Sequence, residues 1–429
     1  MEAGNGEDDE GEERLEREEA AKAAGRPLRY AVVGLGGIAR THLAGLQAAP
    51  LVRPGVLPAV ELAAAVVGAG HAAEAERLGF QQVQVVEEPR GPAEVARAVR
   101  ALAGRVDFLD VCLPNGLHAA AAGAAWESGM AVYCEKPLTA DLAEARALAE
   151  RVRGGGGGAA PGRPFGLAYN LRFDPNLALL RALLAGGLLG EPLHFRLRML
   201  HGGYLDPGRP ISWKFEPALA RGGALVDLGS HLLDLVGYLF APLGEGGEVR
   251  RVRARLRTFA ASRAGSLLGS GGHPIDDWAE VALTLAGGAE GTVEVSRVAD
   301  GGEGTRVEVY GSGGSARIDL EAGRLDLRLH AGGLHLHGRA GELARRVETR
   351  LGEEEPFRWY RRVEALLPPP ARSLGRMVDT HLASLAFWLE AAEEARHQRP
   401  WSGDAAGLEA GLAVEGLLEG IRQAAEDEG

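Results

Sequence analysis

The stretch LRYAVVGLGGIA, residues 28–39, decides the fold of this chain. It is an apolar run that leads directly into a glycine-rich turn, and a helical pattern of apolar residues follows. Strand, tight turn and helix in this order are typical of a dinucleotide-binding βα unit, and Gly34, Gly36 and Ala39 have its G-x-G-x-x-A spacing. Gly34 permits the turn, Gly36 lets a pyrophosphate approach the helix amino terminus, and Ala39 lets helix and strand pack closely. We therefore expect NAD or NADP to bind here.

Further apolar runs without polar alternation follow this unit, and helical patterns separate them. Strands buried on both faces are typical of a parallel sheet that is covered by helices on each side. The sequence thus predicts a doubly wound Rossmann domain over residues 27–153. Its expected strands are 28–33, 62–67, 83–86, 108–113 and 131–134, and its expected helices are 72–78, 92–102, 117–127 and 141–153.

A five-glycine run, residues 154–158, interrupts the helical pattern, and we place the domain boundary there. Residues 154–429 then form a second α/β domain with a large, open, mostly antiparallel sheet, because its apolar residues alternate with polar ones. Residues 341–376 are expected to be irregular, and the two closing helices can pack back on the first domain. The expected elements are a strand at 164–170, further strands at 194–199, 249–259, 280–285, 291–297, 306–310, 316–320 and 325–329, and helices at 377–396 and 404–426.

Composition restricts the class of protein. A chain of 429 residues suits two domains, and two cysteines argue against a disulfide framework and for a cytoplasmic location. The longest stretch without charged residues, 111–126, is too short for a membrane helix. Of the net charge of -12, residues 2–19 carry -8. We therefore expect residues 1–26 to be a disordered acidic tail, and we expect neither nucleic acid nor membrane as a partner.

Lysine is rare in this chain. Of 47 basic residues, 44 are arginine, and the lysines are Lys22, Lys136 and Lys214. A lysine that remains in such a composition is a candidate for a task that needs a compact ammonium group rather than a guanidinium.

The adenosine end of the expected cofactor site lacks a familiar group. Gly68 stands at the end of the second strand, where an Asp or Glu usually binds the ribose hydroxyls. Without this carboxylate a 2′-phosphate would not be repelled, so NADP is admissible and slightly favoured over NAD. Arg40 and His71 could meet a 2′-phosphate or could equally be solvated surface residues. The predicted cofactor residues are Gly34, Gly36, Gly37, Ile38, Ala39, Arg40, Gly68, His71, Pro114, Asn115, His118, Glu135 and Lys136.

Two further segments carry polar groups to the same edge of the sheet. Cys134-Glu135-Lys136-Pro137 follows the fifth strand, and the PNGLH turn, residues 114–118, follows the fourth. Ligands of open α/β folds bind at this edge, so Asn115 and Lys136 should converge on one crevice. Farther on, Asp227 and His231 are four apart and share one face if the segment is helical.

With these segments, the sequence strongly resembles the Gfo/Idh/MocA family of glucose-fructose oxidoreductases, inositol dehydrogenases and rhizopine-catabolism proteins. The resemblance runs from Leu28 to about Gln423 and rests on GLGGIARTHL, PNGLH, CEKPLT, GLAYNLRFDP, GRPISWKFEPALARGGALVDLGSHLLDL and EVYGSGGSARIDL. It implies oxidation or reduction of a sugar, inositol or related diol with NAD(P), and homodimers or homotetramers built through the second sheet. The family's Lys, Asp and His then fall on Lys136, Asp227 and His231.

The chemistry of these three residues can also be stated on its own. His231 would exchange the hydroxyl proton, because an imidazole titrates near neutral pH, and Lys136 would stabilise charge on the reacting oxygen. Asp227 would hold a substrate hydroxyl. The structural alternatives are a strand-end lysine and a helix-internal or metal-binding Asp–His pair, but no other His or Cys stands at ligand spacing, and we expect no metal. The predicted substrate-binding residues are Tyr169, Asn170, Arg172, Trp213, Lys214, Asp227 and His231, while His201 and His118 are interpreted as structural unless they face the pocket.

Two other functions remain open from sequence. One is a glycoside hydrolase that uses NAD for transient oxidation, and the other is a non-catalytic NAD(P)-binding sensor. A dehydrogenase is favoured over a sensor because a sensor has no need of a complete set of proton-transfer residues. A transiently oxidising hydrolase differs from a dehydrogenase in keeping its cofactor tightly bound, whereas a dehydrogenase must release it.

Overall fold

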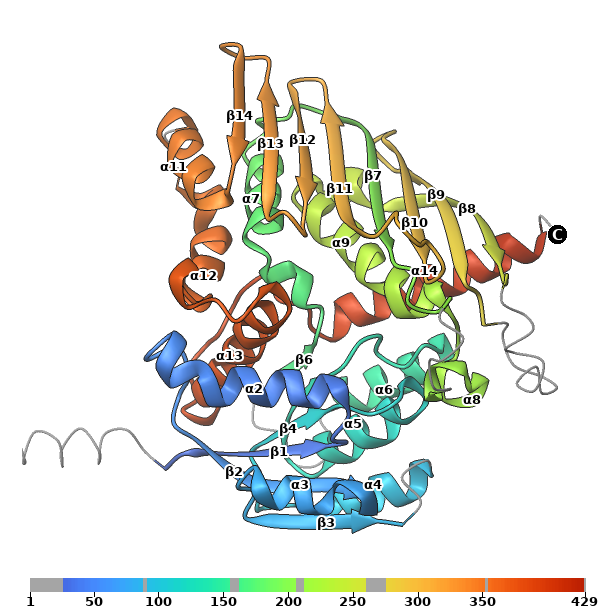
Figure 1. Ribbon diagram of the computed structural model, residues 1–429, viewed down its shortest axis with the longest axis vertical. Helices are drawn as coiled ribbons and strands as arrows, with labels where there is room; N and C mark the ends of the chain where they lie inside the picture. Colours follow the sequence, from blue (N-terminus) through green and yellow to red (C-terminus); the bar gives the residue numbers. More distant parts are fainter. Residues whose placement is uncertain are drawn as a thin grey trace, which may run out of the picture.

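The computed structural model describes residues 26–87, 91–154, 162–205, 212–259, 275–351 and 354–427. Its strands form two sheets, and each sheet is packed against helices (Figure 1). Residues 1–25 of the predicted tail and 155–158 of the glycine run lie outside the described residues.

The first sheet has six parallel strands in the order β3-β2-β1-β4-β5-β6, which confirms the predicted doubly wound sheet. Its sixth strand follows the glycine run, so the predicted boundary at residue 153 falls one strand before the sheet ends along the chain. The strands are β1 (Leu28–Val33), β2 (Val60–Gly68), β3 (Gln82–Val86), β4 (Phe108–Val111), β5 (Ala131–Cys134) and β6 (Phe165–Leu167).

Helices cover both faces of this sheet. α2 connects β1 to β2 and α5 connects β4 to β5 in the opposite direction across the sheet, so right-handed crossovers place them on opposite faces. α2 packs beside α13, and α4 and α6 pack beside α5. The helices are α2 (Gly37–Val52), α3 (Ala72–Arg77), α4 (Pro92–Arg100), α5 (His118–Glu127), α6 (Leu142–Arg153) and α13 (Arg376–Arg396).

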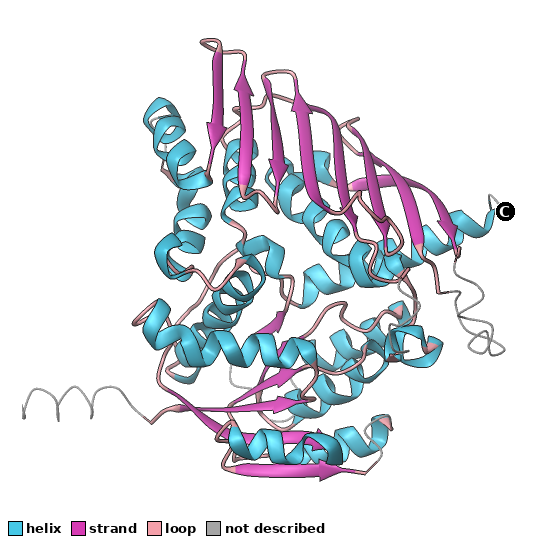
Figure 2. Cartoon of the chain, in the orientation of Figure 1, coloured by secondary structure: helices cyan, strands magenta, loops and turns pink. Residues whose placement is uncertain are grey.

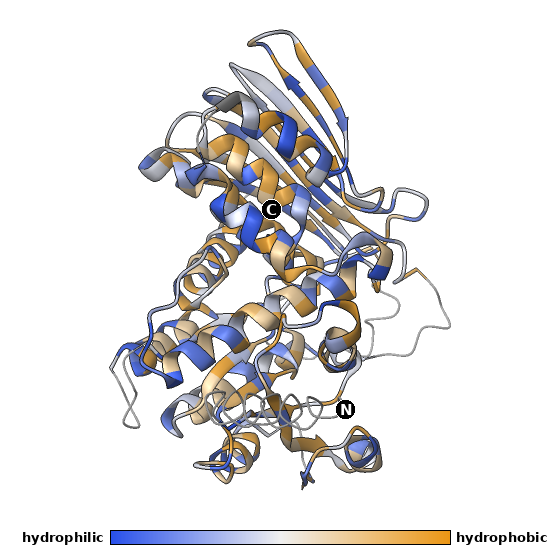
Figure 3. Ribbon diagram, turned by 90° about the vertical axis from the view of Figure 1, so that its left-hand side faces the viewer, coloured by the Kyte–Doolittle hydropathy of each residue, from blue (hydrophilic) through white to orange (hydrophobic). Residues whose placement is uncertain are grey.

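The second sheet has eight strands in the order β14-β13-β12-β11-β7-β10-β9-β8. All of its pairs are antiparallel except β10 with β7, as predicted for a mostly antiparallel sheet. Hydrophobic and hydrophilic residues alternate along its strands (Figure 3). The strands are β7 (Pro192–Leu200), β8 (Val249–Arg257), β9 (Trp278–Leu285), β10 (Glu290–Ser296), β11 (Gly304–Gly311), β12 (Gly314–Asp319), β13 (Arg324–Leu329) and β14 (Leu334–Gly338).

Helices pack against one face of the second sheet, and the described chain leaves its other face without a helix (Figure 2). α7 (Pro175–Ala185), α9 (Ser230–Phe240) and α14 (Leu408–Asp427) contact its strands directly. The alternating strands fit this arrangement, because only one face of each strand is buried.

Residues 341–376 contain two helices, so the prediction that this segment is irregular is wrong. They are α11 (Ala340–Leu351) and α12 (Arg358–Leu366). α12 buries Trp359, Tyr360, Val363 and Leu366, whose spacing is that of one helix face. The many charged residues of the segment lie on the other helix faces, and they obscured the helical spacing of the apolar residues in the sequence.

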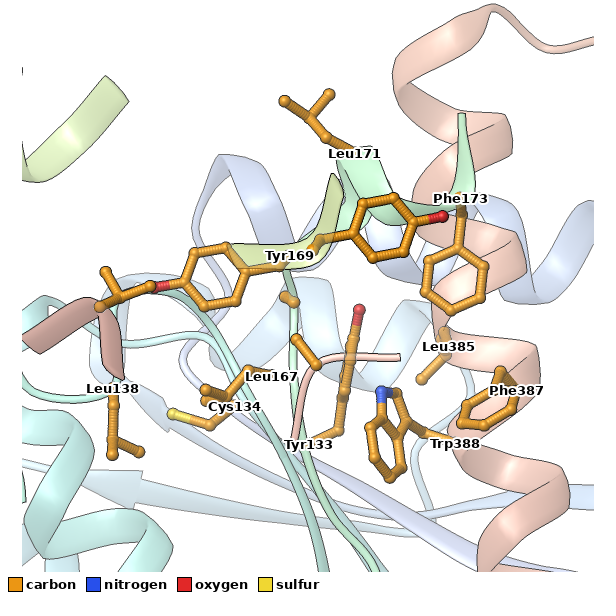
Figure 4. Packing of buried hydrophobic residues seen from close by; sticks show 14 of the residues in the cluster. Tyr133, Cys134, Leu138, Leu167, Tyr169, Leu171, Phe173, Leu385, Phe387 and Trp388 are labelled. Carbon is orange, nitrogen blue, oxygen red and sulfur yellow. The ribbon is translucent and has the colours of Figure 1, made fainter. Parts of the chain in front are cut away.

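The closing helices return to the first sheet. α13 lies against β5 and α2, and α14 lies against α6. Figure 4 shows Trp388 and Phe387 of α13 among buried side chains from β5 and β6, such as Tyr133 and Leu167. Gly166 of β6 is required for this contact, because a Cβ there would stand 2.4 Å from Cδ2 of Trp388.

One described run, Pro217–Gly247, is long and apolar enough to cross a membrane by composition alone, with a mean hydropathy of 1.4 in its most apolar window. That window is 72% buried inside the protein. The run consists of α8 (Pro217–Ala220), the π-helical turn η5 (Leu225–Gly229), α9 and the turn that follows, and it packs under the second sheet as a core segment.

Candidate active site

A cavity of about 830 Å³ lies between the carboxyl edge of the first sheet and the second sheet. The ends of β1, β2, β4 and β5 meet at this edge, as expected for parallel strands. The predicted cofactor residues that line the cavity are Gly34, Gly36, Gly37, Ile38, Gly68, His71, Pro114, Asn115, Glu135 and Lys136, and the predicted substrate residues that line it are Asn170, Trp213, Lys214, Asp227 and His231.

The glycine turn has the shape that a pyrophosphate needs. Gly34 has a φ of +87°, and a Cβ there would stand 2.4 Å from the carbonyl oxygen of Cys112, so no side chain fits. A Cβ on Gly36 or Gly37 would meet nothing within 4 Å, which leaves the cavity side of the turn open. α2 begins here without a side-chain cap, so its first N–H groups are available to an anion. These residues fit a dinucleotide.

The adenosine end of the cavity is formed by Gly68 and His71. Arg40 does not line the cavity, because its guanidinium forms two hydrogen bonds to Glu74, at 2.6 and 2.7 Å. These bonds lower the pKa of Glu74 to about 2, with a smaller contribution from His71, whose Nδ1 lies 3.4 Å from the carboxylate. The nearby Glu74 carboxylate does not line the cavity either, and both it and Arg40 are engaged with each other.

Two predicted cofactor residues are enclosed by protein. Ala39 is fully buried between α2 and the strands. His118 is also fully buried, and its two ring nitrogens lie 2.8 Å from the carbonyl oxygens of Pro137 and Leu113. His118 therefore links the turns after β4 and β5, which agrees with its structural interpretation.

Asn115 lines the cavity, but its amide also has a structural partner. Its Nδ2 donates to the carbonyl oxygen of Ala220 at 2.7 Å, which attaches the turn after β4 to α8. Asn115 thus connects the first sheet to the segment that carries Asp227.

Asp227 is held by two of the three lysines. Nζ of Lys214 donates to both carboxylate oxygens at 2.9 and 2.7 Å, and Nζ of Lys136 lies 3.3 Å from Oδ1 and donates to the main-chain oxygen of Asp227 at 2.7 Å. Burial alone would raise the pKa of Asp227, but Lys214 and Lys136 lower it. Burial would likewise lower the pKa of Lys214, but Asp227 raises it. The carboxylate is therefore ionised and the Lys214 ammonium charged.

His231 lies one turn farther along the same segment. Asp227 sits in the π-helical turn η5, which closes after five residues rather than four, and both side chains line the cavity. Burial lowers the pKa of His231 well below its usual value, and Lys136 lowers it further. Its Nδ1 is buried without a hydrogen-bond partner among the described residues, and its ring meets Tyr169 edge-on at 6.0 Å. His231 is thus a neutral imidazole.

Tyr169 and Arg172, both predicted to bind substrate, do not line the cavity. Arg172 is buried and forms two hydrogen bonds to Asp234 of α9, at 2.8 and 2.6 Å. It also donates to the main-chain oxygen of Asp404 at 2.9 Å. Arg172 therefore links η3 (Asn170–Phe173) to α9. Tyr169 packs edge-on against the His231 ring without lining the cavity.

Several lining residues were not predicted. His201 lines the cavity, which is the exception made to its structural interpretation, and α13 supplies three more residues. Of these, Arg376 offered a signal, because a cation in the first turn of a helix opposes the helix dipole. The unpredicted polar, sulfur-containing or aromatic residues are Cys112, Met199, His201, Tyr204, Thr305, Arg376, Met377 and His381.

A cluster of titratable groups lies directly below the cavity. His42 of α2 brings together two sets whose ligand atoms lie within 4.8 Å of one another, one with Asp110 and Cys112 and one with Glu135 and His381. These His and Cys residues do not stand at ligand spacing in the sequence, because they come from distant parts of the chain. Nδ1 of His42 lies 2.9 Å from Oδ2 of Asp110 and Nε2 lies 3.1 Å from Nδ1 of His381, both at hydrogen-bond distance, whereas Oε1 of Glu135 has no hydrogen-bond partner among the described residues.

Comparison with known proteins agrees with this architecture. Residues 28–157 match the family model described as "Oxidoreductase family, NAD-binding Rossmann fold", and residues 177–317 match the model described as "GFO/IDH/MocA C-terminal domain". The chain belongs to the Gfo/Idh/MocA oxidoreductase family. The resemblance stated from its sequence motifs is thereby confirmed.

Relatives within the Gfo/Idh/MocA family include sugar and inositol dehydrogenases. The chain is 31% identical to levoglucosan dehydrogenase of Pseudarthrobacter phenanthrenivorans over 227 residues, which are 50% of this chain and 56% of that protein. It is 29% identical to inositol 2-dehydrogenase of Mycolicibacterium gilvum over 298 residues, or 69% and 72% of the two chains. The match to levoglucosan dehydrogenase, like the matches to two other curated relatives, spans about half of the relative's length.

Solved structures from the family extend the likeness over nearly the whole chain. A levoglucosan dehydrogenase in complex with NADH and levoglucosan superposes with a TM-score of 0.74 at 25% identity, covering 94% of this chain and 98% of that one. An inositol dehydrogenase homologue from Azotobacter vinelandii in complex with NAD+ shares the fold, with a TM-score of 0.70 at 22% identity over 94% of this chain and 97% of that one.

Proposed function

We propose that the protein is an NAD(P)-dependent dehydrogenase or reductase that acts on a secondary alcohol or carbonyl of a sugar, inositol or related diol. One observation carries this proposal: a single cavity joins the glycine turn to Lys136, Asp227 and His231. The names of its sugar and inositol dehydrogenase relatives support the substrate class.

Lys136 would act on the reacting oxygen. The nicotinamide, when bound, supplies the carbon that accepts or donates a hydride. The Lys136 ammonium has three N–H donors, and its two contacts in the structure, the main-chain and Oδ1 oxygens of Asp227, leave one for the substrate. A positive charge at this place stabilises negative charge that develops on an oxygen in the transition state.

His231 would take the hydroxyl proton. Its pKa is lowered by burial and by Lys136, so the ring is neutral at pH 7 and can accept a proton at once. The same two influences make the imidazolium short-lived, which favours return of the proton to bulk water or to a carbonyl substrate in the reverse direction.

Asp227 would hold a neighbouring hydroxyl. A carboxylate offers about four acceptor sites. Lys214 and Lys136 occupy three of them, which leaves one for a hydroxyl donor. Two adjacent hydroxyl groups on one ring could then meet Lys136 and Asp227 together, which fits a polyol better than a simple alcohol.

The cofactor would be NAD or NADP without strong discrimination. The absence of a carboxylate at Gly68 favours NADP slightly, but Glu74 pairs with Arg40, one of the two basic residues that could have met a 2′-phosphate. NADH and NAD+ are bound in related structures, which supports NAD.

The open face of the second sheet would form the subunit interface. The described chain places no helix on it, and the family resemblance implies a homodimer or homotetramer through this surface. The two cysteines, both buried and unpaired, fit a cytoplasmic enzyme.

The direct experiment is a panel of sugars, inositols and diols tested for reduction of NAD+ and NADP+ by the purified protein. We expect turnover with at least one polyol that carries adjacent hydroxyl groups and none with simple secondary alcohols. Tight NADH binding without turnover on any member of the panel would contradict the proposal and favour a sensor.

A further inference from the structure

The buried cluster below the cavity has a defined hydrogen-bond order. Oδ2 of Asp110 lies 2.6 Å from the hydroxyl of Tyr30 and 2.9 Å from Nδ1 of His42, and Oδ1 lies 3.3 Å from Sγ of Cys112. Burial raises the pKa values of the Tyr30 hydroxyl and the Cys112 thiol, so both groups keep their protons and donate. Asp110 is therefore the acceptor for all three, and Nδ1 of His42 carries a proton.

The second nitrogen of His42 faces two groups. Nε2 is hydrogen-bonded to Nδ1 of His381 at 3.1 Å, and it lies 3.2 Å from Oε1 of Glu135, an oxygen that has no hydrogen-bond partner among the described residues. Burial would raise the pKa of Glu135, but His42 lowers it, so Glu135 is ionised. A bare nitrogen lone pair beside a carboxylate oxygen would be repelled, so Nε2 of His42 also carries a proton.

His42 is thus an imidazolium between two carboxylates. Burial alone would lower its pKa, but Asp110 raises it well above the usual value. The charge of His42 is therefore set by the fold rather than by solvent pH near neutrality.

The charge of His42 determines the tautomer of His381. Nδ1 of His381 can only accept from Nε2–H of His42, so the single proton of the neutral His381 ring sits on Nε2. Burial and the nearby His42 charge lower the pKa of His381 to about 3, which keeps the ring neutral. His381 also lines the cavity that holds Lys136 and His231.

We propose that His381 is a substrate-contacting residue whose Nε2–H donates to an oxygen of the ligand bound beside Lys136, and that His42 is the positioning residue that fixes this tautomer. The inference rests on the proposed function and extends it to a residue of α13. Thr380, its neighbour, receives a hydrogen bond from Nδ2 of Asn170 at 2.8 Å, which holds this turn of α13 against the substrate side of the cavity.

Two substitutions at His381 separate the two ring nitrogens. In His381→Gln the amide reaches the place of Nε2 and can still donate into the cavity, whereas in His381→Asn it reaches only the place of Nδ1. We expect His381→Asn to lower kcat/KM for the polyol about tenfold, the value of one hydrogen bond, and His381→Gln to recover most of this loss. NADH affinity should stay within about twofold in both variants, because the donor serves the substrate.

Equal losses in the Gln and Asn variants would overturn the contact. A parallel loss of NADH affinity would also overturn it, because the acceptor would then be the nicotinamide carboxamide rather than the substrate.

A measurement without turnover tests the tautomer itself. Imidazole ¹⁵N NMR of the full chain at pH 6 to 8 should show His42 with both nitrogens protonated and His381 with a proton on Nε2 alone. His42→Asn keeps a donor to Asp110 but removes the one to His381, so the His381 signals should move toward a mixture of tautomers.

Protonation of His381 on Nδ1, or a stoichiometric metal ion in the purified protein that replaces these protons, would overturn the inference even if the enzyme is active. Inactivity on every polyol, with the expected NMR pattern intact, would contradict the proposed function instead.

Discussion

Nζ of Lys136 and Oδ1 of Asp227 lie 3.3 Å apart although 91 residues separate them in the chain. The lysine lies two residues beyond the end of the parallel strand β5, and the aspartate sits in a π-helical turn below the second sheet. The contact joins the cofactor side of the cavity to its substrate side, so a change on either residue should alter the chemistry more than the fold.

Lys136→Arg tests the need for a compact ammonium. The variant keeps the charge but places a bulkier planar group beside the reacting oxygen, so we expect turnover to fall about 100-fold or more. Steady-state kinetics on one active polyol measures the effect. NADH affinity, followed by fluorescence, should change only a few-fold, and near wild-type turnover would show that Lys136 does not touch the reacting oxygen.

His231→Ala tests the proton acceptor. We expect turnover to fall about 100-fold or more, with partial recovery at high pH, where hydroxide can replace the base. The wild-type pKa of His231 lies well below its usual value, so the neutral form dominates at neutral pH and His231 should add no acid limb to the wild-type rate between pH 6 and 8. A pH profile of kcat for both proteins checks the two statements, and a flat loss at all pH values would argue for a structural role.

Lys214→Met tests the charge on Asp227. Lys214 lowers the pKa of this carboxyl, and burial would raise it once the ammonium is removed. Since the folded pKa of Asp227 is depressed, its ion pair stabilises the protein above the unfolded pKa of about 3.9 and this contribution is lost as pH falls through the folded value. We therefore expect the Met variant to lose kcat/KM at a higher pH than the wild type, by one unit or more. Lys214→Arg is the matched control, and an unchanged acid limb in the Met variant would exclude this role.

The cofactor site should discriminate weakly between NADH and NADPH. Gly68 offers no carboxylate to repel a 2′-phosphate, and Arg40 is paired with Glu74 rather than free to attract one. Fluorescence titrations should give dissociation constants within about 100-fold of each other, which is about 2.7 kcal/mol. A larger preference for NADH would show that Glu74 takes the role of the missing carboxylate. Glu74→Gln should then admit NADPH.

Gly166→Ala should destabilise the protein, because the added Cβ would meet the ring of Trp388 at 2.4 Å. Overpacking of this kind costs about 1 to 3 kcal/mol. Gly416→Ala, on α14, is the matched control, since its Cβ would meet nothing within 4 Å and should leave stability equal or higher. Urea unfolding of both variants measures the difference, and equal stability of the two would show that α13 can move away from β6.

The order strand, glycine turn, helix could be predicted from residues 28–39 because its causes are local. A positive φ at Gly34, the apolar period of a buried strand and the need for a small residue at Ala39 all act within a few residues. The place of Lys136 followed for the same reason, since the carboxyl ends of parallel strands share one edge whatever the rest of the chain does. The family resemblance added the roles of Asp227 and His231.

Tertiary structure alone decided the partners of these residues. Asp227 pairs with two lysines, Arg40 pairs with Glu74, and His42 contacts His381. Each of these contacts joins segments whose proximity no local sequence pattern predicts. His42 and His381 stand 339 residues apart and meet because α13 packs back on α2. Packing of buried faces brings such groups together, and burial then sets their charges by removing the water that would screen them.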